Sequence, residues 1–228
     1  MTHHNAVVCV SGGLDSATVL AMAAAEFSKC LALSFDYGQR HRHELACAAA
    51  LCASMGHEHR IIQIDPRIMS GSALTGGGDV PKTADVEIGQ GIPDTYVPAR
   101  NTVFLAMGLA VAEVEHAEAV YIGANAVDYS GYPDCRPEFI EAFDRLATLA
   151  TRSGVEGRPI RILAPLLSMT KADIIREGVR LGVDYGLTSS CYDPGSDGGP
   201  CQMCESCRLR AKGFEDADRV DPLVETVR

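Results

Sequence analysis

The residues with the clearest chemical potential form one short string near the start of the chain: Ser11-Gly12-Gly13-Leu14-Asp15-Ser16. It follows an apolar run that ends at Val10 and precedes an alanine-rich run typical of a buried helix. Two consecutive glycines let the backbone approach a ligand closely, and the first N–H groups of a helix have no partner within it. Because these donors and the helix dipole favour anions, the string predicts a phosphate site.

Asp15 is the unusual member of the string, because a carboxylate repels a neighbouring phosphate unless a divalent cation lies between them. We therefore expect Asp15 to contact Mg²⁺, directly or through water. The hydroxyls of Ser11 and Ser16 are expected to add hydrogen bonds to the phosphates. A capped tight turn is the simpler alternative, since Ser and Asp commonly cap helices.

The complete string resembles the pyrophosphate loop of the N-type ATP pyrophosphatases. It lacks the Gly-Lys-Ser/Thr of a Walker A loop and the spaced glycines of a dinucleotide fingerprint. The resemblance implies that ATP is cleaved between its α and β phosphates and that the AMP moiety is transferred to an acceptor oxygen. Residues expected to bind ATP are the string itself together with Val10, Phe35, Tyr37, Gly38 and Gly123.

Four cysteines near the C-terminus form a second motif: Cys191, Cys201, Cys204 and Cys207. Two of their spacings are C-x2-C, which lets neighbouring thiolates share one metal ion. We expect structural Zn²⁺, one per chain, and an iron–sulfur cluster is the main alternative. A closed four-cysteine site ties the C-terminal segment to the rest of the chain. Cys135 lies near the expected ligand loops, as a nucleophile or as a thiol that lines the substrate site.

The elements that must position these residues alternate between strands and helices. Apolar runs predict strands at 5–10, 30–35, 60–64, 120–123 and 160–163, and helices at 42–55, 102–115, 137–153 and from 168 or 170 to 181. This alternation predicts an α/β fold, a Rossmann-like parallel sheet with helices on both faces. The predicted domains are residues 1–185 and a zinc-binding tail, residues 186–228.

Ligands of a parallel sheet bind beyond the carboxyl ends of its strands, so the loops beginning at Ser11, Asp36, Gly123 and Pro165 are expected to share one rim. Lys171 lies in the first turn of a predicted helix, where the helix dipole disfavours a cation. We expect it to bind a phosphate of ATP, with a solvated surface lysine as the alternative.

Composition narrows the classes of partner. The chain has 20 basic and 30 acidic residues and a formal net charge of −10, which disfavours a broad nucleic-acid or membrane surface. No apolar run reaches the length of a membrane span, and we expect a cytoplasmic protein whose thiols stay reduced. The glycine-rich stretch 65–98 is expected to close over an intermediate or simply to connect two elements.

The ordered motifs resemble the 7-cyano-7-deazaguanine synthase family of the queuosine pathway. The resemblance rests on residues 11–16, 35–41, 97–101 and 128–135, on Lys171 and on the four cysteines. It implies a ligase that uses ATP and ammonium to convert 7-carboxy-7-deazaguanine to the nitrile through an amide. A related adenylating enzyme, either an amide-forming ligase or a tRNA thiolase, is the alternative, and a zinc-ribbon module that binds nucleic acid is a third hypothesis.

Further residues are assigned expected roles on this rim. Asp15, Lys171 and Arg100 are the expected catalytic residues, with Arg100 reaching a phosphate through its forked guanidinium. The expected substrate contacts are Asn125, Asp128, Tyr132 and Asp134. Loop architecture and helix capping are the alternative roles for these loop residues. We expect a homodimer, and we expect the histidines at 41, 43, 57 and 59 to lie on the surface.

Overall fold

The computed structural model describes residues 4–76, 78–82, 91–127 and 131–225. Five parallel strands form its sheet, in the order β3-β2-β1-β4-β5. Their bounds are β1 (Ala6–Cys9), β2 (Cys30–Asp36), β3 (Glu58–Gln63), β4 (Ala119–Tyr121) and β5 (Arg161–Leu163). The predicted parallel α/β sheet is confirmed.

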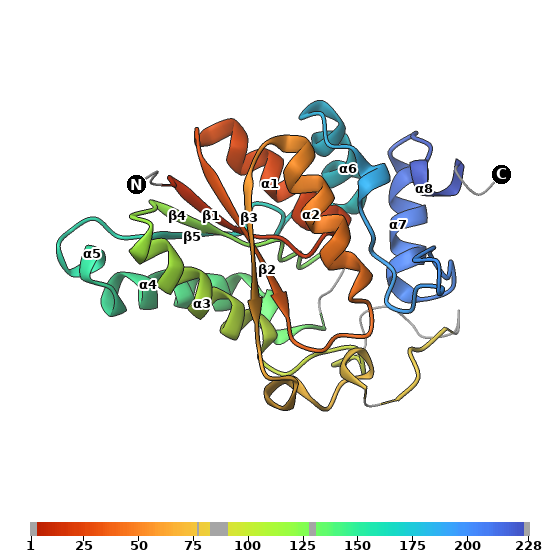
Figure 1. Ribbon diagram of the computed structural model, residues 1–228, viewed down its shortest axis with the longest axis horizontal. Coiled ribbons are helices and arrows are strands. Elements are labelled where there is room, and N and C mark those ends of the chain that lie inside the picture. Colours follow the sequence, from red (N-terminus) through yellow and green to blue (C-terminus); the bar gives the residue numbers. More distant parts are fainter. Residues whose placement is uncertain (1–3, 77, 83–90, 128–130, 226–228) are drawn as a thin grey trace.

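Helices cover both faces of the sheet (Figure 1). One face carries α1 (Leu14–Glu26) and α2 (His43–Met55), and the other carries α3 (Arg100–Val114) and α4 (Pro137–Ala150). Helix α6 (Lys171–Arg180) packs on α1, and α7 (Glu205–Asp216) packs on α6. The short elements are α5 (Arg152–Val155), α8 (Pro222–Glu225), η1 (Pro66–Met69), η2 (Ala73–Thr75), η3 (Pro133–Cys135) and η4 (Tyr185–Leu187).

The core lies in two layers because successive side chains of a strand point to opposite faces. In β1, Val7 belongs to the layer under α3 and α4, which includes Leu105 and Phe143. Its neighbour Val8 belongs to the layer under α1 and α2, which includes Leu20. Strands β1, β2 and β4 are buried along their whole length, which explains their uninterrupted apolar runs.

Two predicted helices differ from the structure by two or more residues at one end. The predicted helix 137–153 ends at Ala150, because Thr151 is extended (φ −114°, ψ 150°) and its hydroxyl caps α5 by accepting a hydrogen bond from the Gly154 N–H. Helix α3 begins at Arg100, two positions before the predicted start, after Ala99 in a left-handed conformation (φ 53°). That turn places Arg100 at the beginning of the helix rather than in the preceding loop.

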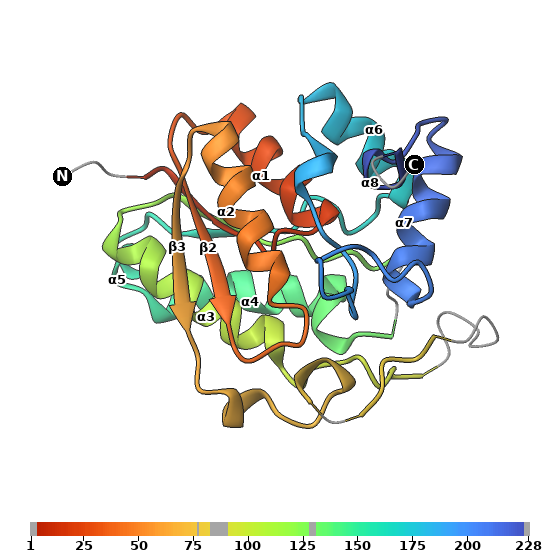
Figure 2. The ribbon, with the colours of Figure 1, turned by 45° about the vertical axis from the view of Figure 1, so that its right-hand side comes forward.

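The predicted domain boundary after residue 185 falls inside η4. The segment after β3 runs beneath the carboxyl ends of β2 and β3 (Figure 2). Its described part holds η1 and η2, while residues 77 and 83–90 lie outside the described ranges. None of the helices in the described ranges is long and apolar enough to cross a membrane.

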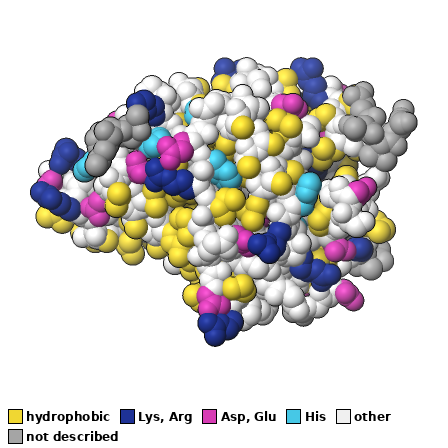
Figure 3. Space-filling view, in the orientation of Figure 1, with side chains coloured by type: hydrophobic (Ala, Val, Ile, Leu, Met, Phe, Trp, Pro, Cys, Tyr) yellow, Lys and Arg dark blue, Asp and Glu magenta, His cyan; other side chains and the backbone are white. Residues whose placement is uncertain are grey.

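Basic side chains are scattered over the face shown in Figure 3, and several lie beside acidic ones. Ion pairs of this kind join Arg67 to Asp65 and Arg180 to Glu177 in the described residues. This face therefore offers no continuous basic surface, in agreement with the acidic net charge of −10.

Candidate active site

A cavity of about 200 Å³ opens at the carboxyl ends of β1, β2 and β4. Val10, Phe35 and Gly123 line it at these three ends. Further parts of the wall come from the first turns of α1, α2, α3 and α6, from the tail, and from the segments that carry Tyr37, Asn125 and Tyr132. Its position is the one expected for the ligand crevice of an open parallel sheet.

The expected phosphate loop is held in shape by one of its own hydroxyls. Ser16 Oγ accepts hydrogen bonds from the N–H groups of Ser11 and Gly12, both at 3.2 Å, and donates to the Gly13 carbonyl at 3.0 Å. The Ser16 hydroxyl therefore organises the loop in this structure. Ser11 is exposed and lines the cavity together with Gly13.

Gly12 allows helix α2 to pack directly against this loop. Its φ of +96° lies in the left-handed region, and a Cβ at this position would lie 2.1 Å from the Glu44 carbonyl oxygen and 2.8 Å from the Ala48 nitrogen. No other residue type fits such a site without displacing the backbone of α2. The glycine predicted from sequence for phosphate approach thus also brings the first turn of α2 to the cavity.

Asp15 and Lys171 meet across the mouth of the loop. Lys171 Nζ lies 2.8 Å from Oδ1 and 2.9 Å from Oδ2 of Asp15. Thr170 caps α6 by accepting a hydrogen bond from the Asp173 N–H, which fixes the turn that carries Lys171. Lys171 is only 8% exposed, so the alternative of a solvated surface lysine is wrong.

Arg100 enters the cavity from the first turn of α3, and Tyr37 lines the same cavity. Burial lowers the pKa of Arg100, but Tyr37, Tyr132 and Cys135 raise it above its ordinary value, so the guanidinium stays charged. Phe35 stacks on Phe104 with ring centroids 4.1 Å apart. Gly38 adopts φ +81° behind this wall and is absent from the residues that line the cavity.

The residues expected to contact the second substrate differ in position. Tyr132 lines the cavity, and its hydroxyl lies 2.8 Å from that of Thr95. Asn125 also lines it, with its amide donating to the carbonyls of Leu166 and Met169 at 3.0 and 2.7 Å. These contacts fix both side chains in the cavity wall.

Asp134 is buried and does not line the cavity. One of its carboxylate oxygens accepts the N–H of Asn101 at 2.9 Å, in the first turn of α3, so the helix-capping alternative describes its observed contact. Asp128 lies outside the described residues. Cys135 lines the cavity, and burial raises the pKa of its thiol to about 11, which disfavours the thiolate needed for a nucleophile.

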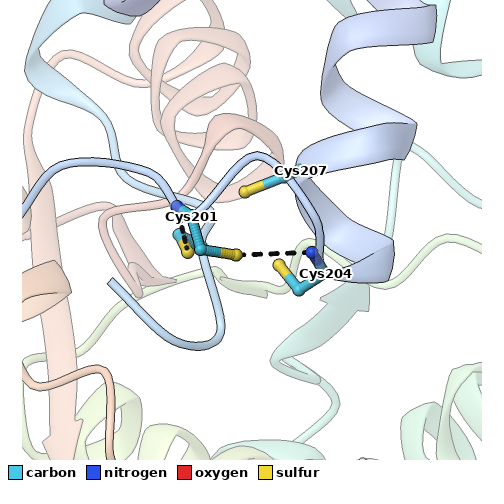
Figure 4. Close-up of side chains that lie close together, drawn as sticks. Cys201, Cys204 and Cys207 are labelled. Carbon is cyan, nitrogen blue, oxygen red and sulfur yellow. Dashed lines mark hydrogen bonds between the residues drawn. The ribbon is translucent and has the colours of Figure 1, made fainter. Parts of the chain in front are cut away.

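The four cysteines of the second motif converge on one point. Their sulfurs all lie within 4.8 Å of one another. Figure 4 shows the side chains of Cys201, Cys204 and Cys207 gathered beside the start of α7. The Cys201 N–H donates to Cys191 Sγ at 3.2 Å and the Cys204 N–H to Cys201 Sγ at 3.3 Å, contacts that stabilise thiolates. Four converging sulfurs fit a tetrahedral metal site.

Comparison with known proteins identifies the family. The family model described as "Queuosine biosynthesis protein QueC" matches residues 5–218. The chain belongs to this QueC family. Among curated relatives, the 7-cyano-7-deazaguanine synthase of Pseudomonas fluorescens (strain SBW25) is 57% identical over 224 residues, which cover 97% of this chain and 98% of that protein. The protein of the same name from Myxococcus xanthus (strain DK1622) is 57% identical over 219 residues, 95% of each chain.

A protein of low sequence identity shares the fold of this QueC family member. The solved NMN synthetase of Francisella tularensis superimposes with a TM-score of 0.50 at 15% sequence identity, covering 99% of this chain and 82% of that one. At this identity the likeness concerns the fold alone. It agrees with the parallel α/β architecture described above, and a fold of this kind carries different functions in different families.

Sequence reasoning on this QueC family chain missed several residues of the cavity wall. His41 was expected on the surface but is buried, 6% exposed, and lines the cavity with Glu44. His41 is the last residue of the polar string that follows the second strand. Its place in that string was the signal that could have assigned it to the cavity. His4, to which no role was assigned, is also buried, between Glu58 and Glu115. Further missed lining residues come from the tail: Ser189, Ser190, Tyr192, Ser206, Leu209 and Arg210.

Proposed function

We propose that this chain is an ATP-dependent carbon–nitrogen ligase that converts 7-carboxy-7-deazaguanine and ammonium to 7-cyano-7-deazaguanine. Family membership and relatives with this name at 57% identity support the proposal. The structural observation that carries it is the Asp15–Lys171 pair, which lies beside the phosphate loop in a cavity large enough for small molecules.

The chemistry of the reaction explains why ATP is needed. A carboxylate is a poor acyl electrophile because its leaving group is oxide. Transfer of AMP to that oxygen creates a good leaving group, and ammonia then displaces it to give the amide. A second adenylation, on the amide oxygen, allows elimination to the nitrile. The site has to position the reactants and to stabilise the charge that grows on the departing pyrophosphate.

The residues on the phosphate-binding side of the cavity are assigned roles from their positions. The loop Val10–Ser16 binds the phosphates through its backbone, Lys171 stabilises the departing pyrophosphate, and Arg100 contacts a phosphate or the acyl oxygen. Phe35 and Tyr37 form the border of the adenine site, and Gly38 shapes the turn behind them. Gly123 lets the nucleotide approach α1, since a Cβ at this position would lie 3.4 Å from the Ser16 nitrogen.

The second substrate binds on the α3 side of the cavity. Tyr132 stacks on its ring, Asn125 contributes a polar contact, and Asp128 pairs with its guanine-like edge. Asp134 supports this side by capping α3. Cys135 lines it without reacting.

Two metals accompany this function. Asp15 is the residue that would hold Mg²⁺ with ATP, since its carboxylate faces the cavity and oxygen is the preferred ligand; Mg²⁺ supplies charge neutralisation of the phosphates. Cys191, Cys201, Cys204 and Cys207 would hold Zn²⁺, which supplies a structural link between the tail and the cavity wall. We further propose a cytoplasmic homodimer that does not bind nucleic acid, consistent with the net charge of −10.

Product analysis tests the proposal. The chain is incubated with ATP, MgCl₂, ammonium chloride and 7-carboxy-7-deazaguanine, and the products are followed by mass spectrometry. The expected products are AMP, pyrophosphate and the nitrile, and all three should be lost in D15N. Accumulation of the amide without nitrile would indicate an amide-forming ligase. Absence of nucleotide turnover, or formation of ADP, would contradict the proposal.

A further inference from the structure

Glu44 is a carboxylate in the cavity wall to which neither the family motif nor the proposed adenylation assigns a role. It lies in the first turn of α2, and its side chain is 12% exposed. Helix α2 packs against the phosphate loop at Gly12, where a Cβ would lie 2.1 Å from the Glu44 carbonyl oxygen. This packing brings the first turn of α2, and with it Glu44, to the cavity. A carboxylate here repels the triphosphate, so its natural ligand is a cation or a hydrogen-bond donor.

One oxygen of Glu44 is held and the other is available. Gln39 Nε2 donates to Oε1 at 3.4 Å, and His41 Nε2 lies 3.4 Å from the same oxygen. Among the described residues, no hydrogen bond to Oε2 is present. Burial and the charge of Arg100 lower the pKa of His41 to about 4, so the imidazole is neutral and does not serve as a counter-ion to Glu44. The carboxylate therefore keeps its capacity to bind a small cation.

The groups that face Glu44 leave its charge incompletely neutralised. Arg100 approaches from α3, but it is also engaged by Tyr37. Cys47 lies on the same helix, and its thiol is neutral because burial raises its pKa. Burial raises the pKa of Glu44 to about 8, against the opposing effects of Arg100 and Gln39. A carboxyl group with this pKa is present in both its ionised and its protonated form between about pH 7 and 9, and its ionised form accepts a proton far more readily than an ordinary glutamate does.

We infer that Glu44 in its ionised form binds the ammonium ion and accepts its proton, so that ammonia is released beside the acyl adenylate. This inference rests on the proposed function. Ammonium has no lone pair and cannot attack carbon. When Glu44 takes one proton, ammonia forms the C–N bond, the bond from carbon to the AMP oxygen breaks, and the second proton passes from nitrogen to the phosphate of the departing AMP. The products are the amide and AMP, with Glu44 protonated until it releases its proton to solvent.

The test separates the two halves of the reaction. Adenylation is followed as exchange of labelled pyrophosphate into ATP, which needs the carboxylate substrate but no ammonium. In E44Q we expect exchange close to wild type and kcat/KM for ammonium lowered by about 100-fold. E44D should recover part of this loss. The matched control is E113Q, which removes a carboxylate from the far end of α3, outside the cavity lining.

Hydroxylamine gives a readout that a merely structural role would not move. It is a neutral nucleophile near pH 7 and needs no deprotonation before it attacks the adenylate. E44Q should therefore form the hydroxamate at nearly the wild-type rate while it uses ammonium poorly.

Four results overturn the inference. Unchanged ammonium saturation in E44Q and E44D shows that Glu44 has no role in ammonium use. Equal loss of exchange, hydroxamate formation and amide formation shows that Glu44 has a structural role. An effect confined to KM for the carboxylate substrate shows that Glu44 contacts the base of that substrate. Absence of exchange in the wild-type chain contradicts the proposed function itself, and this inference with it.

Discussion

Asp15 and Lys171 stand 156 positions apart in the chain and form a two-pronged ion pair at the cavity wall, with Nζ to oxygen distances of 2.8 and 2.9 Å. The first turn of α1 supplies the carboxylate and the first turn of α6 supplies the ammonium group. The packing of α6 on α1 brings them together. The pair holds both charges next to the loop where the phosphates are proposed to bind.

The first prediction concerns the charge of Lys171. In K171M, pyrophosphate exchange should fall by about 100- to 1000-fold, because a cation aimed at developing charge typically contributes this much. The control is K212M, which removes a lysine with a side chain that is 70% exposed and pairs with Asp216 outside the cavity lining. Exchange in K171M within a few fold of the K212M rate would contradict the role assigned to Lys171.

The second prediction concerns the close packing at Gly12. In G12A the free energy of unfolding should fall by about 3 kcal/mol or more, since the new methyl group adds a clash with the α2 backbone to the cost of positive φ. In G76A the loss should be only about 1 kcal/mol, because Gly76 has the same φ of +96° and no atom within 4 Å of the place that a Cβ would occupy. Denaturant titration measures both, and equal losses would show that backbone conformation alone decides the cost.

The overall fold was predictable because its signals are local. The apolar runs of β1 and β2, the glycine loop after β1 and the capping residue Thr170 all lie within a few positions of the element they specify. Where two local signals competed, the prediction failed: Thr151 continues the apolar pattern of α4 but its hydroxyl caps α5. The alternation of strands and helices along the whole chain predicted that the sheet is parallel.

The cavity was only partly predictable because its contacts are long-range. The phosphate loop, Arg100 and Lys171 were found from local motifs, but the partner of Lys171 depends on the packing of α6. His41 was misplaced on the surface because no periodic pattern assigns a burial side to a histidine in a turn. The tail residues Ser190 and Arg210 reach the cavity only after the tail folds back, which no local pattern describes.

The third prediction concerns the four-cysteine cluster. C204S should lower the bound zinc, measured by elemental analysis of the purified protein, to well below one ion per chain, because only three thiolates remain. Cleavage of the tail by trypsin should become faster, since the tail loses its link to the cavity wall. The control is C47S, at a partly buried cysteine outside the cluster. Unchanged zinc in C204S, or iron and sulfide in the wild-type protein, would contradict the zinc assignment.

The fourth prediction concerns stability against pH. Burial raises the pKa of Glu44 to about 8 in the folded chain, above its ordinary value of 4.5, so the folded state holds a proton that the unfolded state has released. Stability from Glu44 is therefore present below its unfolded pKa and is lost as the pH rises toward the folded value. Between pH 6.5 and 7.5 the wild type should lose about 1.4 kcal/mol per pH unit relative to E44Q.

Between pH 6.5 and 7.5, His41 contributes little to the change of stability with pH. Its folded pKa of about 4 lies below its ordinary value of 6.5, so its effect on stability falls mainly at lower pH. Denaturant titrations of wild type and E44Q at several pH values give the difference directly. Parallel pH profiles for the two proteins would show that Glu44 is ionised throughout this range.

The central claim is that AMP is transferred to the carboxyl oxygen of the substrate, and oxygen-18 tests it most directly. With 7-carboxy-7-deazaguanine labelled in its carboxyl group, the account predicts AMP that carries one labelled oxygen for the first turnover of each molecule, with unlabelled pyrophosphate. Unlabelled AMP, or label recovered in inorganic phosphate together with ADP, would contradict it.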